Sequence, residues 1–482
     1  MAMPRVLGTL SLLVLSLLAD VATARDAGDF LAGKALQSKH GDVSVVATRP
    51  EELTTVRYTH ETYGDQIKNA FSDLIFGMLL VVLGFPVLYY NEKREAHMDK
   101  IFAYGEKIVK TNVPSGSVDG NYEANLTHMQ GVTACDEILR DDDFGIGLTN
   151  CAKLSKEVEM FQWQEQSSVE ERDTPGGGKD KITTYTYSRG WSSEPVDSSS
   201  FQEVGGHENP PFPFQGRQDV ATKVGFGAFQ LTPSLIGQMN NFQPLADGEQ
   251  PPSLNRAGRV FQLKAGIYET FSGTPQIGDM RVTFRKVPCG PATVLAVQHE
   301  DSFVPLTYDM VPQSSCPCLV SVPEKVELPQ GASGSLLNKG ASPSGAFMLC
   351  QCVGMCIEAG ESLNDLATET LSAADMFTRA KNTQACIRKS LKLCGYLLFF
   401  FGLFMQFKFV PTFFRIIPFI GTWIQFFGNM FAYLGAFFIA NFLWCFTVAI
   451  AWLAFRPAKG VLLIAASIAM IAVPTYLANK FD

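Results

Sequence analysis

The sequence predicts an α+β membrane protein with four transmembrane helices, one N-terminal and three C-terminal, and a large β-rich soluble domain between the first and the second. Two observations lead to this fold class. Residues 391–477 are almost continuously apolar, whereas about 20 apolar residues suffice to cross a bilayer. The polar region before them alternates aromatic and β-branched residues in the manner of strands. A chain of 482 residues has room for both parts.

The N-terminal residues 1–24 have the anatomy of a secretory signal peptide or a signal anchor. Arg5 precedes an apolar stretch, and Ala22-Thr23-Ala24 resembles a cleavage site. Residues 25–70 form a mixed polar segment, in which 43–47 is expected to be a short strand.

The first transmembrane helix is expected over residues 71–90. Pro86 would kink this helix, and Tyr89-Tyr90 at its end would form an aromatic belt at the membrane surface. The charged run 91–95 is then interpreted as the polar stop.

The large β-rich domain is expected over residues 91–380. Its clearest pattern is a long hairpin, with strands at 158–166 and 181–191 around a glycine-rich loop. Further strands are expected at 260–265, 280–286 and 292–299, a short helix near 234–239, irregular chain over 206–214, and a Cys-rich insertion over 311–360.

The C-terminal part begins with helical spacing over 361–392. It continues as a helix over 381–409 that leads into the second transmembrane helix. Residues 410–428 contain Pro411, Arg415 and Pro418 and suit the membrane interface. Two further transmembrane helices are expected, over 429–455 and over 459–478.

The formal net charge of −8 argues against nucleic acid as a partner, because the phosphate backbone requires a basic face. The clustered lysines and arginines lie beside the apolar segments, where such residues set membrane topology. Membrane lipids are therefore the first partners that the sequence predicts.

Eight cysteines lie between the apolar segments, and an even set of this kind is typical of disulfides in an oxidising lumen. Metal binding and thiol exchange are the alternatives for the close pairs. The eight candidates for disulfides are Cys135, Cys151, Cys289, Cys316, Cys318, Cys350, Cys352 and Cys356.

Asn125-Leu126-Thr127 is a sequon, so Asn125 is a candidate for glycosylation in the lumen.

His207-Glu208 and His299-Glu300 each place a base beside a carboxylate, but neighbouring strand residues point to opposite faces. We interpret both histidines as ordinary polar residues and name no catalytic residue, cofactor site or metal site.

Several motifs resemble a known family, and they are spread from about Tyr58 to Leu477. They are Tyr89-Tyr90-Asn91-Glu92-Lys93-Arg94, Val158-Glu159-Met160-Phe161-Gln162-Trp163, Tyr185-Thr186-Tyr187, Trp191-Ser192-Ser193-Glu194, Gly206-His207-Glu208-Asn209-Pro210, Ile277-Gly278-Asp279-Met280-Arg281-Val282-Thr283-Phe284, Phe303-Val304-Pro305-Leu306 and Arg456-Pro457. The pattern resembles the transmembrane protein 43 (LUMA) family.

This resemblance implies residence in the endoplasmic reticulum and the inner nuclear membrane, self-association, and partnership with nuclear-envelope proteins such as emerin and lamins. It implies no enzymatic activity. The signal-like residues 1–24 and the Cys-rich stretch 316–356 depart from the family pattern.

Two lines of reasoning about topology conflict. A cleaved signal and the basic residues around 93–100 and 379–392 favour a cytoplasmic domain, whereas the resemblance, the even cysteine count and the sequon favour the lumen. We expect the lumen.

The sequence thus predicts a non-enzymatic membrane scaffold that oligomerises. Two alternatives remain open: a channel or transporter component, with Asn429, Asn441 and Thr447 among its polar residues, and a luminal thiol or disulfide protein.

Overall fold

The computed structural model describes residues 43–49, 52–174, 178–246, 248–312, 326, 361–414, 420–458 and 460–461. These residues form two compact units. Unit 1 contains the described residues up to Leu79 together with Ser167–Thr186 and Gly402–Gly435. Unit 2 contains Leu80–Gln166, Tyr187–Phe401 and the described residues from Ala436 onward. The predicted signal segment 1–24 lies outside the described residues.

Three helices of the described chain are long and apolar enough to cross a membrane. They are α3 (Tyr63–Ile108), α6 (Ala373–Phe413) and the part of α7 (Ile420–Phe455) that begins at Phe426. One precedes the β-rich domain and two follow it, which confirms the predicted fold class. The fourth predicted helix, over 459–478, lies outside the described residues apart from positions 460 and 461.

Helix α3 is longer than the apolar stretch that predicted it. Its 46 residues span about 70 Å at a rise of 1.5 Å per residue, more than twice the thickness of a hydrocarbon core. The run 91–95, expected to be a polar stop, continues as helix. Beyond it, Met98, Ile101 and Phe102 are buried in a core of unit 2, so packing extends the helix past the polar run.

The start of α6 and the chain beside it also differ from the expectation. Helical spacing predicted a helix from residue 361, but α6 begins at Ala373. The preceding residues form β20 (Ser362–Leu363) and β21 (Asp365–Ala367). Leu366 pairs with Val294 of β17 and is fully buried, so tertiary pairing overrides the local helical pattern. Residues 410–413 end α6, and 420–428 belong to α7.

Strands lie where the sequence predicted the long hairpin and the strands at 43–47, 260–265, 280–286 and 292–299. The short helix α4 (Pro233–Gln238) also lies where it was expected. The strands are β1 (Val43–Arg49), β2 (Glu52–Glu61), β3 (Lys110–Pro114), β4 (Leu126–Ala134), β5 (Leu139–Asp141), β6 (Ile146–Leu148), β7 (Cys151–Asp173), β8 (Lys179–Ser192), β9 (Arg217–Val220), β10 (Gly225–Phe226), β11 (Phe229–Gln230), β12 (Gln243–Pro244), β13 (Ser253–Arg256), β14 (Arg259–Lys264), β15 (Ile267–Glu269), β16 (Met280–Pro288), β17 (Pro291–His299), β18 (Ser302–Val304), β19 (Leu306–Thr307), β20 and β21.

Unit 2 contains two larger sheets. In the first, the strand order is β8-β7-β16-β15-β14-β13; in addition, β9 pairs with β7 and β12 pairs with β16. In the second, the order is β11-β10-β4-β17-β18, with β21 on β17 and β3 parallel to β4. The larger core of this unit contains a cluster of rings around Phe144, which contacts Phe261 and Phe284 at centroid distances of 5.3 and 5.4 Å.

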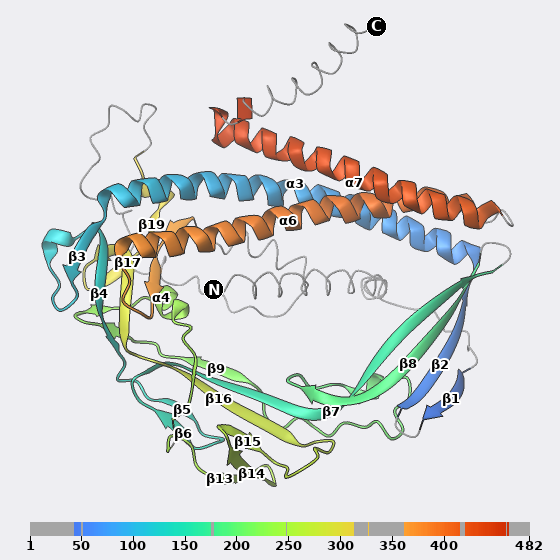
Figure 1. Cartoon of the computed structure of the whole chain (residues 1–482), viewed down its shortest axis with the longest axis horizontal. Coiled ribbons are helices and arrows are strands. Elements are labelled where there is room, and N and C mark those ends of the chain that lie inside the picture. The colour runs from blue at the N-terminus through green and yellow to red at the C-terminus, as the bar shows by residue number, and fades with distance from the viewer. Residues whose placement is uncertain are drawn as a thin grey trace, which may run out of the picture. The chain divides into compact units, whose positions relative to one another are not determined.

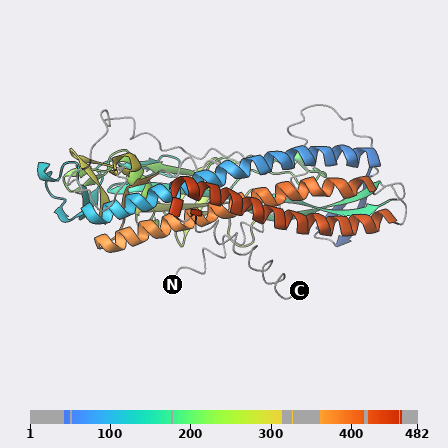
Figure 2. The same cartoon turned by 90° about the horizontal axis from the view of Figure 1, so that it is seen from above.

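A second core in unit 2 fixes the helices to the soluble domain. It contains Ile101 and Phe102 of α3, Phe377 of α6, and Leu295 and Val297 of β17, all of them buried. Figure 2 shows α3 and α6 side by side. Gly84 and Gly395 permit their close approach, because a Cβ at Gly84 would lie 2.6 Å from the Phe399 ring.

Unit 1 contains the tip of the hairpin and the strands that precede α3. β2 pairs with β8 over eight residues, from Thr54 opposite Thr186 to Glu61 opposite Lys179. The helix then begins with a capping pair: the Thr62 hydroxyl accepts from the Asp65 amide at 3.2 Å and donates to the Asp65 carboxylate at 2.7 Å.

Candidate functional site

Three carboxylates lie on one face of α3 just beyond its apolar stretch. Glu92, Glu95 and Asp99 are spaced three, four and seven residues apart, which places them on successive turns of the same face. The Glu92 side chain is 1% exposed and that of Glu95 is 11% exposed. Such burial is unfavourable for ionised groups unless cations and hydrogen-bond donors surround them.

Three cations surround these carboxylates, two from α6 and one from the residue that directly follows α7. Arg388 of α6 lies 3.1 Å from Glu95, and Lys392 of α6 lies 2.8 Å from Glu92 and 3.1 Å from Glu95. Arg456, which directly follows α7, lies 2.8 Å from Glu95 and also pairs with Asp99. We call these six residues the charge cluster.

The charge cluster joins three helices that are remote in sequence. Its formal charges balance, and the Trp452 indole N–H of α7 donates to Glu92 at 2.7 Å. A buried ion pair contributes little net stability, but loss of one partner is strongly unfavourable because the other charge remains buried. The arrangement therefore specifies the register of α3 against α6 and α7.

A ring stack connects this region to the soluble domain. The rings of His97 and Tyr308 are stacked at a centroid distance of 3.6 Å, and His97 also pairs with Glu361. Lys100 of α3 donates to the Tyr308 hydroxyl at 2.9 Å. On α3, His97 lies between Glu95 and Asp99 of the charge cluster, so the same stretch of helix contacts the soluble domain through Tyr308.

A second group of motif residues converges at the base of the hairpin in unit 2. The Asn209 side chain accepts from the Trp163 amide at 2.7 Å and donates to the Trp163 carbonyl at 3.0 Å. The Gln162 side chain bridges the Glu194 carbonyl at 3.0 Å and the Val196 amide at 2.9 Å. We call this the hairpin corner. The side-chain amides of Gln162 and Asn209 thereby attach the irregular segments around 194–196 and 209 to β7.

The candidate histidines have structural surroundings. His207 is buried, stacks on Tyr187 at 4.1 Å and contacts the Glu203 carbonyl through Nδ1 at 3.1 Å. His299 pairs with Glu123 at 2.8 Å. No hydrogen bond or ion pair joins His207 to Glu208 or His299 to Glu300, and the strand geometry expected for these pairs does not apply, because residues 207 and 208 lie outside the strands and β17 ends at His299.

Three of the eight candidate cysteines are described, and they are free thiols. Cys135, Cys151 and Cys289 lie close enough to interact electrostatically, and burial raises the pKa of all three, that of Cys289 to about 11. A raised pKa disfavours the reactive thiolate. The other five, Cys316, Cys318, Cys350, Cys352 and Cys356, lie outside the described residues, so the predicted disulfides that involve them stay predictions.

Asn125 is 3% exposed, and its side-chain amide donates to the Asn121 carbonyl at 3.1 Å. A glycan on this nitrogen would displace that bond and need space that the folded domain does not have. The structure therefore disfavours the predicted glycosylation, and the sequon loses weight as evidence for the lumen.

Sequence reasoning missed the charge cluster because it assigned each charge to the nearest apolar segment. The signal was present in the spacing Glu92, Glu95, Asp99, which repeats on one helical face. Two of the quoted motifs, at 89–94 and 456–457, meet at this cluster. Three other motifs, at 158–163, 191–194 and 206–210, meet at the hairpin corner.

Comparison with known proteins agrees with these motifs. The family described as Transmembrane protein 43 matches residues 160–457. Transmembrane protein 43 of Rattus norvegicus is 25% identical over 434 residues, which cover 87% of this chain and 94% of the relative. The protein of the same name from Homo sapiens is 28% identical over 278 residues, covering 55% and 68%. A homolog from Drosophila melanogaster is 31% identical over 221 residues, covering 44% and 56%. No solved structure matches the chain.

Proposed function

Because this chain belongs to the transmembrane protein 43 family, we propose that it is a non-enzymatic, multi-pass membrane scaffold of the endoplasmic reticulum and the nuclear envelope. It organises membrane protein complexes and nuclear-envelope structure by self-association and by binding partners. The relatives are named as plain transmembrane proteins and carry no enzyme name, which agrees with this role.

The observation that carries the proposal is the continuous link from apolar helix to soluble domain. In unit 2, α3 leaves its apolar stretch, passes through the charge cluster and enters the second core without interruption. A scaffold must hold its binding surface at a fixed place relative to the membrane. Ion pairs from α6 and from the end of α7 limit the bending of α3 between its apolar stretch and the second core. The buried cluster supports this role more directly than any catalytic role.

Self-association has a candidate surface on α7. Phe438, Phe442 and Phe446 are 67%, 65% and 50% exposed and lie on one helical face. The small residues Ala436 and Ala440 are fully buried within the molecule, so they serve its own packing. Homo-oligomers would therefore form through aromatic contacts, in competition with membrane lipids.

The location of the large domain belongs to the same proposal. We place it in the lumen, with the protein in the endoplasmic reticulum and inner nuclear membranes. Emerin and lamins are the partners that the family resemblance suggests. No nucleic acid is expected, because the chain carries a net charge of −8.

The test is purification of the full-length protein from membranes in mild detergent, followed by chemical crosslinking and mass measurement. We expect discrete oligomers, and we expect Phe438→Ala/Phe442→Ala to shift the distribution toward monomers. The matched control is Phe400→Ala, an aromatic residue of α6. Uniformly monomeric protein with emerin absent from the purified material would contradict the scaffold.

Of the three polar residues first considered for the channel alternative, Asn441 and Thr447 form hydrogen bonds within the protein, whereas Asn429 Oδ1 is buried without a partner among the described residues. Asn441 donates to the Phe437 carbonyl at 2.7 Å and to the Tyr396 hydroxyl at 3.2 Å, and the Thr447 hydroxyl donates to the Leu443 carbonyl at 2.7 Å. Ion flux through the purified protein in liposomes would nevertheless favour that alternative over the scaffold.

A further inference from the structure

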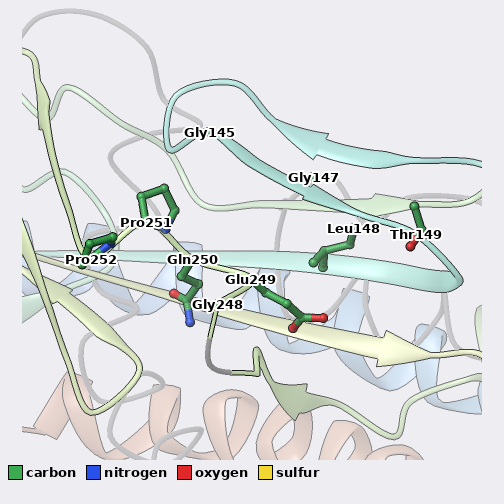
Figure 3. Close-up of a pocket in the computed structure, with 9 residues that line it drawn as sticks. All are labelled: Gly145, Gly147, Leu148, Thr149, Gly248, Glu249, Gln250, Pro251 and Pro252. Atoms are coloured by element: carbon green, nitrogen blue, oxygen red, sulfur yellow. The ribbon is translucent and has the colours of Figure 1, made fainter.

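Two cavities of unit 2 have the size of a ligand site. One, of about 640 Å³, lies in the soluble domain between residues 145–149 and 248–252 (Figure 3). Its charged lining residue, Glu249, is paired with Lys286, so this lining selects no charged ligand. The other, of about 360 Å³, is a groove between α3 and α7. Both volumes lie within the range of about 300–1,000 Å³ that is typical of ligand sites.

The groove between α3 and α7 is mostly apolar, and a ligand can reach both of its walls. Tyr90 of α3 is 58% exposed and Ile450 of α7 is 44% exposed. The hydroxyl of Thr447 already donates to the Leu443 carbonyl at 2.7 Å, so it needs no further partner. The lining therefore favours hydrocarbon. It consists of Phe85, Pro86, Tyr89, Tyr90, Thr447 and Ile450.

The groove lies where α3 leaves its apolar stretch. Residues 71–90 form that stretch, and the charge cluster begins two residues later at Glu92, so the groove is on the membrane side of the charges. The part of α7 that begins at Phe426 is also apolar enough to cross a membrane. Within a bilayer an open apolar surface is covered by lipid chains, because these are the surrounding medium and water is excluded. The position of the groove thus makes a lipid its occupant.

One cation stands at the headgroup end of the groove. Lys93 follows Tyr89 by four residues and Tyr90 by three, which places it on the same face of α3. Long side chains of a helix lean toward its N-terminus, so the Lys93 side chain lies over the turn that carries the two tyrosines. In contrast to Lys392 and Arg456, Lys93 forms no ion pair with any carboxylate of the described chain. Its charge is therefore available to an anion.

The two tyrosines place hydroxyl groups beside this cation. Their contacts in the described chain are ring contacts: Tyr89 packs against Phe455 at a centroid distance of 5.3 Å and against Tyr90 at 6.1 Å. A tyrosine at the membrane surface keeps its ring in the apolar layer and its hydroxyl among the headgroups. A phosphate group accepts hydrogen bonds from both hydroxyl and ammonium donors. The mouth of the groove is thus suited to a lipid phosphate.

We propose that this groove binds one anionic glycerophospholipid, with an acyl chain between α3 and α7 and its phosphate at Lys93 and the Tyr90 hydroxyl. The charge cluster beside the groove balances its own charges, so Lys93 adds a net positive charge that favours an anionic headgroup. The acyl chain continues along α3 over Val82, which is 63% exposed and lies two turns before Tyr90 on the same face. This site goes beyond the proposed scaffold function and does not depend on it.

The test uses full-length protein purified in mild detergent, and native mass spectrometry measures the lipid that each chain binds. Phosphatidylserine, phosphatidylcholine and cholesterol are added in turn. We expect one phosphatidylserine per chain, bound at least tenfold more tightly than phosphatidylcholine. Ile450→Trp should weaken phosphatidylserine binding at least tenfold, because the larger side chain fills the groove. The matched control, Ile439→Trp, changes a 40% exposed residue about three turns earlier on the same face of α7, outside the groove, and it should bind as the unchanged protein does.

Lys93→Gln tests the headgroup contact separately from the acyl chain. It should reduce the preference for phosphatidylserine over phosphatidylcholine to below about twofold, while one phospholipid still binds. The matched control, Lys107→Gln, removes an exposed lysine of α3 about four turns further along, outside the groove, and should keep the preference.

Three results would overturn the proposal. The first is equal lipid binding by Ile450→Trp and Ile439→Trp, or an unchanged preference in Lys93→Gln. The second is tighter binding of cholesterol than of either phospholipid. The third is protein that binds no lipid, which would mean that another segment of the chain or a second copy covers the groove. Self-association is measured separately by crosslinking, so loss of lipid binding leaves the scaffold test intact.

Discussion

Replacing Glu95 with alanine removes one carboxylate from a cluster in which three carboxylates balance three cations. Arg388 loses its carboxylate partner at 3.1 Å, while Lys392 keeps Glu92 and Arg456 keeps Asp99. The result is one uncompensated positive charge on Arg388, whose side chain is 34% exposed, beside Arg456, whose side chain is 11% exposed.

The expected loss follows from this burial. Removing one partner of a buried ion pair typically costs about 3–5 kcal/mol, and because Arg388 is about one-third exposed, solvent screening lowers the expected loss to about 2–3 kcal/mol. The same helices provide a matched control in Glu106 and Lys381, which lie 2.6 Å apart with both side chains 45% exposed. Solvent screening limits such a pair to about 0–1 kcal/mol. Glu95→Ala should therefore destabilise the protein several times more than Glu106→Ala.

The measurement is the free energy of unfolding of the full-length protein in detergent, from denaturant titrations followed by tryptophan fluorescence. A double variant, Glu95→Ala with Arg388→Ala, should recover part of the loss because it removes the uncompensated cation. Equal destabilisation by Glu95→Ala and Glu106→Ala would refute the idea that the cluster fixes the helices.

Two further predictions concern unit 2. Asn209→Ala should leave the Trp163 N–H and C=O without their side-chain partner, at a cost of about 1–3 kcal/mol for each group that stays buried, and hydrogen exchange at the Trp163 amide should accelerate. Burial opposes ionisation of Glu249, but Lys286 and the Ala246 amide outweigh it and hold the pKa of Glu249 below its ordinary value of 4.5. A lowered folded-state pKa contributes stability above pH 4.5 that is lost as the pH falls through the lowered pKa. Acid titration of the free energy of unfolding should show this loss, and Lys286→Met should reduce it; an identical acid limb in that variant would refute the role of the pair.

The elements that the sequence predicted correctly are those with a strong local pattern. The apolar stretch 71–90 predicted α3, and the strands expected at 280–286 and 292–299 correspond to β16 and β17 within a few residues. The run of apolar and β-branched residues that marks such an element is a local property of the sequence.

The features that the sequence did not predict depend on partners distant in the chain. Residues 362–367 have helical spacing, but 365–367 pair with β17 and 362–363 pair with β19. The cations at 388, 392 and 456 were assigned to membrane topology, although each pairs with a carboxylate of α3. A charge beside an apolar segment is thus ambiguous until the helix that packs against it is known.

The pairing of β2 with β8 bears directly on how α3 meets the membrane. β2 precedes the apolar stretch of α3 and β8 follows it, yet the two strands pair over eight residues. A helix that crosses a bilayer once leaves its flanks in different compartments, so this pairing predicts that Arg57 and its register partner Thr183 share one compartment. Directly opposed residues of antiparallel strands have Cα atoms about 4.5–5.5 Å apart, which suits a disulfide.

Arg57→Cys with Thr183→Cys should therefore crosslink on mild oxidation in sealed microsomes. Arg57→Cys with Lys179→Cys, four residues out of register, should not. If the cysteines introduced at positions 57 and 183 were instead labelled from opposite faces of the vesicle, α3 would cross the bilayer once, and β2 and β8 would not pair when the protein is in the membrane. A crosslink would mean that α3 is embedded without separating its flanks, and crossings of the bilayer would then have to begin with α6.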